Sequence, residues 1–417
     1  MQMKRNGWLA GAIAAGAIAL PAYSAVAQDK EVVIGVHCDR TGPTQIVGTV
    51  LCPGQHDYYN LINSKGGIEG FKIRAIEVDT EYKVPPAIEA HQRFKKEGAV
   101  STAVFATPAV LALTKTLEED KILGTSPGFG GSSGADGKRY PYVFPIAATY
   151  WSQGAGAVEF AKKKLGGSLK GKKIAYLYFD NPAGKEPIII IEDLAKIEGF
   201  ELKQFAVPSP GVEMGAQVLD ITARFKPDFI IAHLFGRAPS VAIKELKGKG
   251  FPLSKVIGLV WASAEGDILA AGGWGAAEGY HTIQFAGVGS DYAVIKEINA
   301  MYKAQGKPEP TKLQEQSVNY NRGIMTAALH VEAIRNAIKA KGGAKPTGED
   351  VKKGMESIRG FTLGGLVPPM NITPEDHEGG GWIQVWQVKG GKFVKATEWF
   401  QAHRDLIKKH LEADAKK

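Results

Sequence analysis

Short apolar runs alternate with segments of helical spacing along most of the chain. The apolar runs predict buried strands at residues 31–36, 72–78, 103–105, 173–179, 229–233 and 256–260. Between them, apolar positions three and four residues apart predict helices at residues 54–63, 86–97, 108–119, 150–165, 188–198, 214–224 and 240–249. Strand followed by helix, repeated, predicts parallel sheets with right-handed crossovers, which is the α/β class.

This alternation occurs in two series, one before residue 147 and one from residue 173 onward. The 417 residues exceed what one hydrophobic core usually supports, so we expect two α/β lobes. The last third of the chain does not continue the alternation of strand and helix. It predicts helices at 317–341, 348–358 and 400–417, and a β-hairpin made of 382–388 and 392–396 around Gly390-Gly391.

The N-terminal segment has the pattern of a cleavable secretory signal peptide, residues 1–27. Lys4 and Arg5 precede an apolar run, and Ala25-Val26-Ala27 supplies the small residues of a cleavage site. The run from 8 to 20 is shorter than the roughly 20 residues of a membrane-spanning helix, so a retained anchor is the weaker interpretation. Because no cysteine follows Ala27, no lipid anchor is expected there. We therefore expect a soluble periplasmic protein.

Charge and cysteine content narrow the class further. The formal net charge of +8 falls to +6 once Lys4 and Arg5 are removed, and the remaining lysines are spread over helix ends, so no nucleic-acid partner is expected. Cys38 and Cys52 are the only cysteines. An oxidising compartment favours a disulfide between them, with two buried free thiols as the alternative. Neither cysteine belongs to a zinc-binding pattern, and no metal is expected.

Catalytic motifs are weak or defective. Residues 124–128 match the G-x-S-x-G pattern of hydrolases around Ser126, but Pro127 has no N–H to donate to an oxyanion. The glycine-rich stretch 128–134 has neither the dinucleotide-binding nor the P-loop spacing, so no cofactor is expected. Carboxylate pairs such as Glu118-Glu119 look like solvated surface. This profile favours a binding protein over an enzyme.

Several segments, in order along the chain, resemble the periplasmic solute-binding proteins of ABC transporters, in the branched-chain amino-acid (type I) family. They are residues 32–36, 41–43, 63–70, 126–128, 152–154, 277–280 and 364–366. The resemblance implies two doubly wound lobes with parallel sheets joined by a three-crossover hinge, and a ligand in the cleft at the carboxyl ends of the strands. It implies that lobe 1 comprises 28–147 plus 285–362 and lobe 2 comprises 148–284 plus 363–417. It also implies that the protein delivers its ligand to an inner-membrane permease. Because the protein must diffuse to that permease, we expect a monomer.

The loops after the expected strands hold the candidate ligand-binding residues. They are Arg40, Thr107, Phe129, Gly130, Asn181, Phe235, Arg237, Trp261 and Phe285. The family's amino-acid binders place an acidic residue after Gly-Pro to bind the ammonium group, whereas this chain reads Gly258-Leu259-Val260-Trp261. An unpaired buried cation is costly, so an α-amino acid is disfavoured. Aromatic faces together with Arg237 or Arg40 suit an aromatic carboxylate instead.

We therefore expect a non-enzymatic binding protein for a small organic acid, such as a benzoate or a hydroxycinnamate. Within the binding class, the alternatives are a branched-chain or other amino acid, an aliphatic acid or an amide. An exported hydrolase that uses Ser126 and a sensor domain that reports to a receptor are alternatives from other classes.

Overall fold

Two separate β-sheets organise the computed structural model, which describes residues 30–126, 128, 130–208 and 210–414. The predicted signal peptide, residues 1–27, lies outside the described residues. Residues 31–417 form one compact unit, and the description below concerns this unit alone. None of the helices in the described part of the chain combines the length and the apolar character that a bilayer crossing requires.

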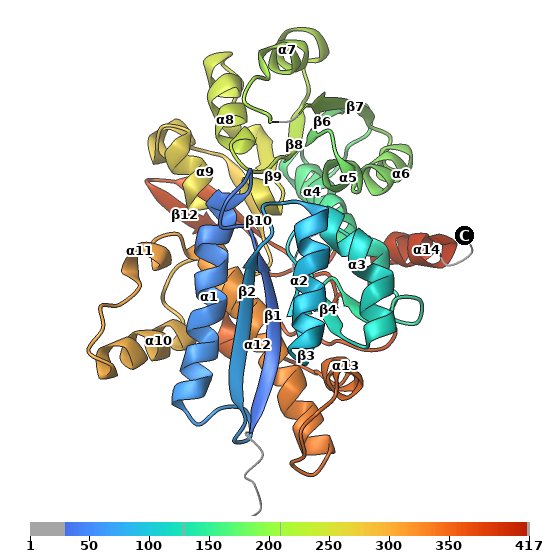
Figure 1. Cartoon of the computed structure of the whole chain (residues 1–417). Coiled ribbons are helices and arrows are strands. Elements are labelled where there is room, and N and C mark those ends of the chain that lie inside the picture. The colour runs from blue at the N-terminus through green and yellow to red at the C-terminus, as the bar shows by residue number, and fades with distance from the viewer. Residues whose placement is uncertain (1–29, 127, 129, 209, 415–417) are drawn as a thin grey trace, which may run out of the picture. The chain divides into compact units, whose positions relative to one another are not determined.

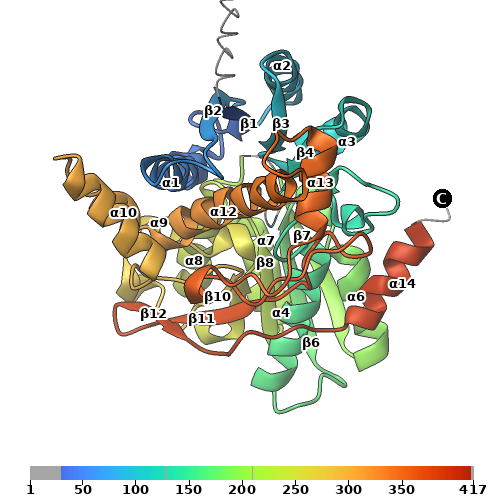
Figure 2. The ribbon, with the colours of Figure 1, turned by 90° about the horizontal axis from the view of Figure 1, so that it is seen from below.

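The first sheet has five parallel strands in the order β2-β1-β3-β4-β5. Its strands are β1 (Glu31–Cys38), β2 (Lys72–Asp79), β3 (Ala99–Ala103), β4 (Leu123–Thr125) and β5 (Val143–Phe144). Helices cover both of its faces, with α2 and α3 on one side and α1, α12 and α13 on the other (Figure 2). These helices are α1 (Gln45–Ser64), α2 (Val84–Lys96), α3 (Thr107–Asp120), α12 (Ser317–Ala340) and α13 (Gly348–Glu356).

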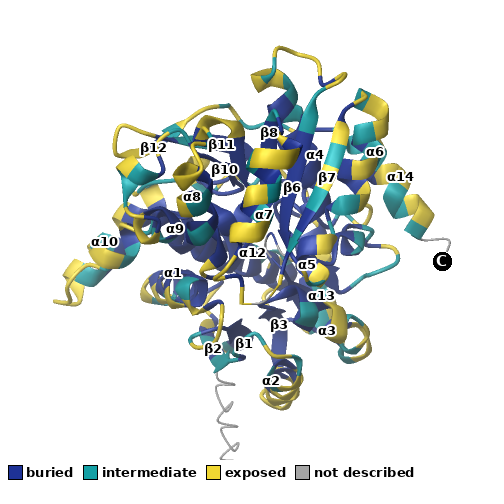
Figure 3. Cartoon of the chain, turned by 90° about the horizontal axis from the view of Figure 1, so that it is seen from above, coloured by how far each residue is buried: buried dark blue, intermediate teal, exposed yellow. Residues whose placement is uncertain are grey.

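The second sheet has seven strands in the order β12-β11-β10-β9-β8-β6-β7. They are β6 (Lys173–Phe179), β7 (Glu201–Val207), β8 (Phe229–His233), β9 (Val256–Gly258), β10 (His281–Gln284), β11 (Gln384–Lys389) and β12 (Lys392–Lys395). The first five pair in parallel, whereas β11 is antiparallel to both β10 and β12. The inner strands β6 and β8 are buried, and the outer faces of the helices beside them are exposed (Figure 3).

The remaining helices flank the two sheets or connect their strands. They are α4 (Tyr150–Lys164), α5 (Pro182–Lys185), α6 (Ile188–Glu198), α7 (Gly215–Leu219), α8 (Ala238–Gly248), α9 (Glu265–Ala270), α10 (Ala293–Ala304), α11 (Thr311–Gln314) and α14 (Arg404–Asp414). The chain passes between the sheets three times, after β5, after β10 and between α13 and β11 (Figure 1). The fold is therefore the predicted one, with two doubly wound α/β lobes joined by three crossovers. The residue boundaries of the two lobes stay a prediction.

Most of the predicted elements are confirmed. The predictions 173–179, 229–233 and 188–198 coincide with β6, β8 and α6, and the C-terminal hairpin forms as β11 and β12. Two predictions were misplaced. The predicted strand at 103–105 covers only the end of β3, because the polar serine and threonine of that strand hid its apolar character. The predicted helix at 54–63 begins earlier, at Gln45, because packing of α1 on α12 outweighs the helix-breaking tendency of Pro53.

One predicted helix is divided. The segment predicted at 214–224 forms α7 and then a π-helical turn, Asp220–Phe225. Four strands and one long helix had not been predicted, namely β4, β5, β7, β10 and α10. Three of these strands have two to four residues, which is too short for a periodic pattern to be visible.

Candidate ligand-binding site

Two adjoining cavities lie where the loops of the two sheets meet. The inner cavity has a volume of about 20 Å³, and its lining residues are Thr44, Val47, Tyr82, Phe105, Ala106, Thr107, Tyr150, Phe235 and Trp261. The outer cavity has a volume of about 800 Å³, and its lining residues are Gly42, Pro43, Gln45, Ile46, Thr49, Tyr82, Phe179, Asn181, Pro210, Val212, Phe235, Gly236 and Arg237. Tyr82 and Phe235 line both cavities and therefore lie between them.

The inner cavity is aromatic and uncharged. Five of its lining side chains carry rings, and none of the described residues that line it is ionic at neutral pH. Trp261 donates its Nε1–H to the hydroxyl of Tyr150 at 2.9 Å, so two of these rings are held in fixed orientation. Such a lining favours a flat apolar group over a charged one.

Asp39, at the end of β1, positions two residues of the inner cavity. Its carboxylate accepts hydrogen bonds from the Thr44 hydroxyl at 2.5 Å and from the Tyr82 backbone N–H at 2.8 Å. Thr80 donates a third at 2.8 Å. Burial raises the pKa of Asp39, and these hydrogen bonds offset part of that increase. Asp39 therefore ties the start of α1 to the loop that follows β2.

A buried arginine of α12 supports Trp261 from behind. The Arg322 guanidinium lies 5.4 Å from the Trp261 ring and 4.8 Å from the Phe285 ring. It donates to the Val260 carbonyl, the Ser263 hydroxyl and the Gln284 amide oxygen at 2.7–2.9 Å. Burial lowers the pKa of Arg322 to about 9, so the side chain is still charged at neutral pH.

Carboxylates near Arg322 balance its charge. Burial raises the pKa of Glu265, which accepts hydrogen bonds from Ser317 and the Val318 N–H, and raises the pKa of Asp267 to about 7. Asp267 lines a third cavity of only about 10 Å³, which has room for about one water molecule. These carboxylates belong to the Arg322 cluster and do not line the inner or the outer cavity.

A carboxylate also joins the loops of the two sheets. Glu186, between α5 and α6, accepts hydrogen bonds from the backbone N–H of Gly131 at 3.1 Å and of Ser132 at 2.5 Å. Gly131 and Ser132 follow β4, in the first sheet, whereas α5 and α6 follow β6, in the second. The two sets of loops are therefore in direct contact beside the cavities.

Five of the predicted site residues line the cavities. Thr107, Phe235 and Trp261 line the inner cavity, and Asn181, Phe235 and Arg237 line the outer one. Arg237 is exposed and makes no ion pair with a described residue. Among the described residues that line these two cavities, it is the only one with a charged side chain.

The other predicted residues lie elsewhere. Arg40 donates to both carboxylate oxygens of Glu77, at 2.7 and 2.8 Å, and lines neither cavity. Phe285 is fully buried against Arg322. Gly130 donates its N–H to the Thr107 hydroxyl at 3.0 Å, and a Cβ there would approach Thr107 and Glu186 to within 2.3 Å, so the position requires glycine. Phe129 lies outside the described residues.

Six residues that line the inner cavity were not predicted from the sequence, namely Thr44, Val47, Tyr82, Phe105, Ala106 and Tyr150. Thr44 directly precedes α1, Phe105 lies between β3 and α3, and Tyr150 is the first residue of α4. Tyr82 could have been found, because it lies in the loop that follows the correctly predicted strand β2.

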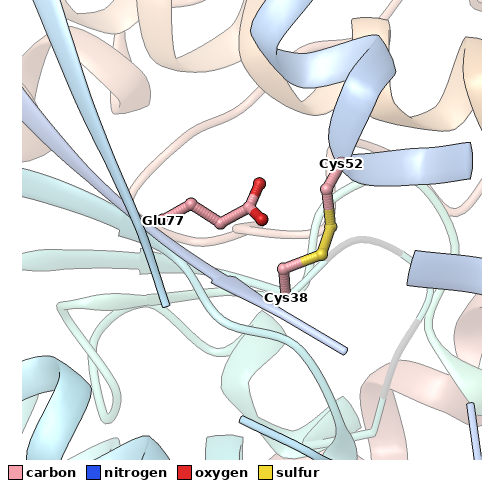
Figure 4. Close-up of side chains that lie close together, drawn as sticks. All are labelled: Cys38, Cys52 and Glu77. Carbon is pink, nitrogen blue, oxygen red and sulfur yellow. A yellow bond between two sulfur atoms is a disulfide. The ribbon is translucent and has the colours of Figure 1, made fainter. Parts of the chain in front are cut away.

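The two cysteines form a disulfide, which links the end of β1 to α1 (Figure 4). The alternative of two free thiols is therefore wrong. The carboxylate of Glu77 points toward the disulfide and is held by Arg40 and by His56 at 2.7 Å. Burial would raise the pKa of Glu77, but the hydrogen bonds from His56 and Arg40 outweigh it and bring the pKa to about 2. Because both sulfurs are bonded to each other, this cluster is not a thiolate metal site.

Comparison with known proteins identifies the class. A family model described as periplasmic binding protein matches residues 31–392, and the chain belongs to this family. No curated protein matches the sequence. The solved structures show the type I fold of periplasmic binding proteins.

One similar structure, from the Pseudomonas fluorescens group and described as an ABC transporter permease, is 34% identical, covers 93% of this chain and 97% of that one, and has a TM-score of 0.83. A fatty acid ABC transporter substrate-binding protein from Thermomonospora curvata is 21% identical over 91% of this chain and 94% of that one, with a TM-score of 0.76. A branched-chain amino acid ABC transporter protein from Thermus thermophilus with bound valine is 23% identical over 91% and 98%, with a TM-score of 0.76. The last two show the fold alone.

Proposed function

We propose that this chain is the solute-binding component of an ABC importer and that its ligand is a small organic acid with an aromatic body. The observation that carries the proposal is the lining of the two cavities, which is aromatic within and has one charged side chain, Arg237, at its outer part. A planar acid would place its ring against Tyr150, Trp261 and their neighbours. Its carboxylate would pair with Arg237, whose planar guanidinium matches a carboxylate bidentately.

An α-amino acid is the less suitable ligand. Its ammonium group needs a carboxylate or several acceptors, and no described residue that lines either cavity carries a carboxylate. An aliphatic acid remains the second candidate, because an uncharged lining with one cation also suits a hydrocarbon chain. The relative from T. curvata is described as a fatty acid binder.

The proposal includes no catalytic step. The Ser126 hydroxyl is buried and has no hydrogen-bond partner among the described residues, so no histidine there acts as its base. The proposed protein is exported by the signal peptide at residues 1–27, works as a monomer, and passes its ligand from the cleft between lobe 1 and lobe 2 to an inner-membrane permease.

A thermal-shift screen of the protein without residues 1–27 tests the proposal. Aromatic acids, aliphatic acids and amino acids are compared, and a ligand at a hundredfold excess over its Kd stabilises the protein by about 2.7 kcal/mol. We expect stabilisation by aromatic acids, and its loss in Arg237→Gln. Arg40→Gln is the matched control, because Arg40 pairs with Glu77 away from the cavities and its loss should leave affinity unchanged. Stabilisation by leucine or valine alone would contradict the proposal.

A further inference from the structure

Tyr82 has an unusual backbone for a bulky residue. Its φ is +60°, in the left-handed region, and that of the preceding Glu81 is +53°. The hydrogen bond from its N–H to Asp39 holds the residue in this conformation. Non-glycine residues persist there only when the surroundings impose it, and such positions cluster at ligand clamps and switch regions.

The conformation places the Tyr82 ring between the two cavities. The ring lies 5.8 Å from that of Phe235, between centroids, and both residues line both cavities. Phe235 is fixed from its other side, because it stacks on Phe179 at 4.5 Å. Among the described residues, no second ring stacks on Tyr82 as Phe179 stacks on Phe235, and Tyr82 is partly exposed in a turn, so its ring is the less firmly packed of the two.

The two rings belong to different sheets. Tyr82 follows β2 of the first sheet, and Phe235 follows β8 of the second. The Tyr82 hydroxyl also lies close to the side chain of Asn181, which follows β6 of the second sheet. The wall between the cavities therefore forms only where the loops of the two sheets meet.

The volumes show what this wall does. With Tyr82 in place, the inner cavity of about 20 Å³ has room for one or two water molecules and not for an aromatic ring. The outer cavity, with Arg237, has about 800 Å³. A ring can enter the inner cavity only if the wall formed by Tyr82 and Phe235 opens, and the two cavities then join into one.

We propose that Tyr82 is the specificity-determining residue of the cleft: a gate whose displacement joins the inner and outer cavities, so that the ligand is an elongated acid with its apolar end inside and its carboxylate at Arg237. This inference rests on the proposed function for the nature of the ligand. The gate itself rests on the position of Tyr82 between the cavities.

A measurement without ligand tests the gate. Trp261 lines the inner cavity behind Tyr82 and is 5% exposed, so its fluorescence quenching by acrylamide reports access to that cavity. The contribution of Trp261 is isolated as the difference from Trp261→Phe. We expect higher quenching in Tyr82→Ala and in the bulkier Tyr82→Leu, which serves if the alanine variant does not fold. Val212→Ala is the matched control, because Val212 lines the outer cavity only and should leave quenching unchanged.

Binding of arylalkanoic acids of increasing chain length, from benzoate to 4-phenylbutanoate, tests the specificity. In Tyr82→Ala, we expect the preferred acid to become longer and the longest acids to gain about tenfold in affinity. Unchanged quenching, or an unchanged order of affinities in the Tyr82 variants, would overturn the gate. If quenching rises but no acid binds the parent protein, the gate stands and the organic-acid proposal fails, so the two failures are distinguishable.

Discussion

Replacing Arg322 with methionine removes a fully buried cation while keeping most of its apolar volume. Arg322 belongs to α12, which packs on α1 beside the first sheet, and its donors reach the loops that follow β9 and β10 of the second. The substitution therefore breaks hydrogen bonds between segments that are far apart in the chain. It also leaves Glu265 and Asp267 without a nearby positive charge.

The expected cost follows from the groups left behind. The Gln284 amide oxygen loses its donor at 2.7 Å, whereas the Val260 carbonyl and the Ser263 hydroxyl lose the arginine but stay hydrogen-bonded to each other. A buried polar group left unpaired costs about 1–3 kcal/mol, and removing one partner of a buried charged cluster costs about 3–5 kcal/mol in total. Relief of the desolvation of Arg322 itself acts in the opposite direction. We therefore expect Arg322→Met to lower the free energy of unfolding by about 3 kcal/mol.

Urea denaturation followed by circular dichroism measures this difference, as a lower midpoint at an unchanged m-value. Arg237→Met is the matched control, since the exposed Arg237 has no ion-pair partner among the described residues, and its effect should lie within about 0.5 kcal/mol. A change below about 1 kcal/mol in Arg322→Met would refute the reasoning, because it would mean that the cluster contributes no more than a surface pair.

Three further predictions concern stability. Replacing Cys38 and Cys52 by serine should lower the free energy of unfolding by about 3 kcal/mol, measured by urea denaturation, and equal midpoints for the parent with and without reductant would contradict this. Gly323→Ala should lower the free energy of unfolding by about 1–3 kcal/mol, because its Cβ would lie 2.0 Å from a carbonyl oxygen of α1. Gly248→Ala is the control: its Cβ would have no atom within 4 Å, so in thermal melts of both variants it should be neutral or stabilising. Burial raises the pKa of Asp267 from 3.8 to about 7, so the folded protein binds a proton that the unfolded chain releases between these values. As pH rises through that window, the parent should therefore lose stability relative to Asp267→Asn, by at most about 1.4 kcal/mol per pH unit. Urea midpoints of the two proteins that change in parallel with pH would contradict this.

The sequence predicted the scaffold better than the site. Strands such as β6 and β8 are continuous apolar runs, and the burial that produces the run also fixes the strand, so the prediction and the structure agree. Short strands such as β5, with two residues, depend on neighbours in the sheet for their existence and leave no such pattern.

For the site, the rule that ligands lie beyond the carboxyl ends of strands located Thr107, Phe235 and Arg237. The rule could not separate residues that reach the cavity from those bonded elsewhere. Arg40 and Arg237 both follow strands, and only the contact of Arg40 with Glu77 distinguishes them. The role of Arg322 could not be predicted from the sequence, because the residue lies in the middle of a long helix and contacts loops more than 30 residues away in the chain.

The charges near the cleft limit the net charge of a suitable ligand. Arg322, which lies against Trp261, is not free to bind a ligand, because its donors are bonded within the protein and Glu265 and Asp267 lie near it. Arg237 is thus the one described cation that lines the cavities without a protein partner. A ligand ammonium among the aromatic rings could gain about 0.5–2 kcal/mol from cation–π contacts, whereas burying it unpaired costs several kcal/mol. Because the cost of burying an ammonium exceeds this gain, the cleft favours a ligand with a single negative charge. The outer cavity is large enough for ligands of different length, so Tyr82 determines how long the apolar part of the ligand is.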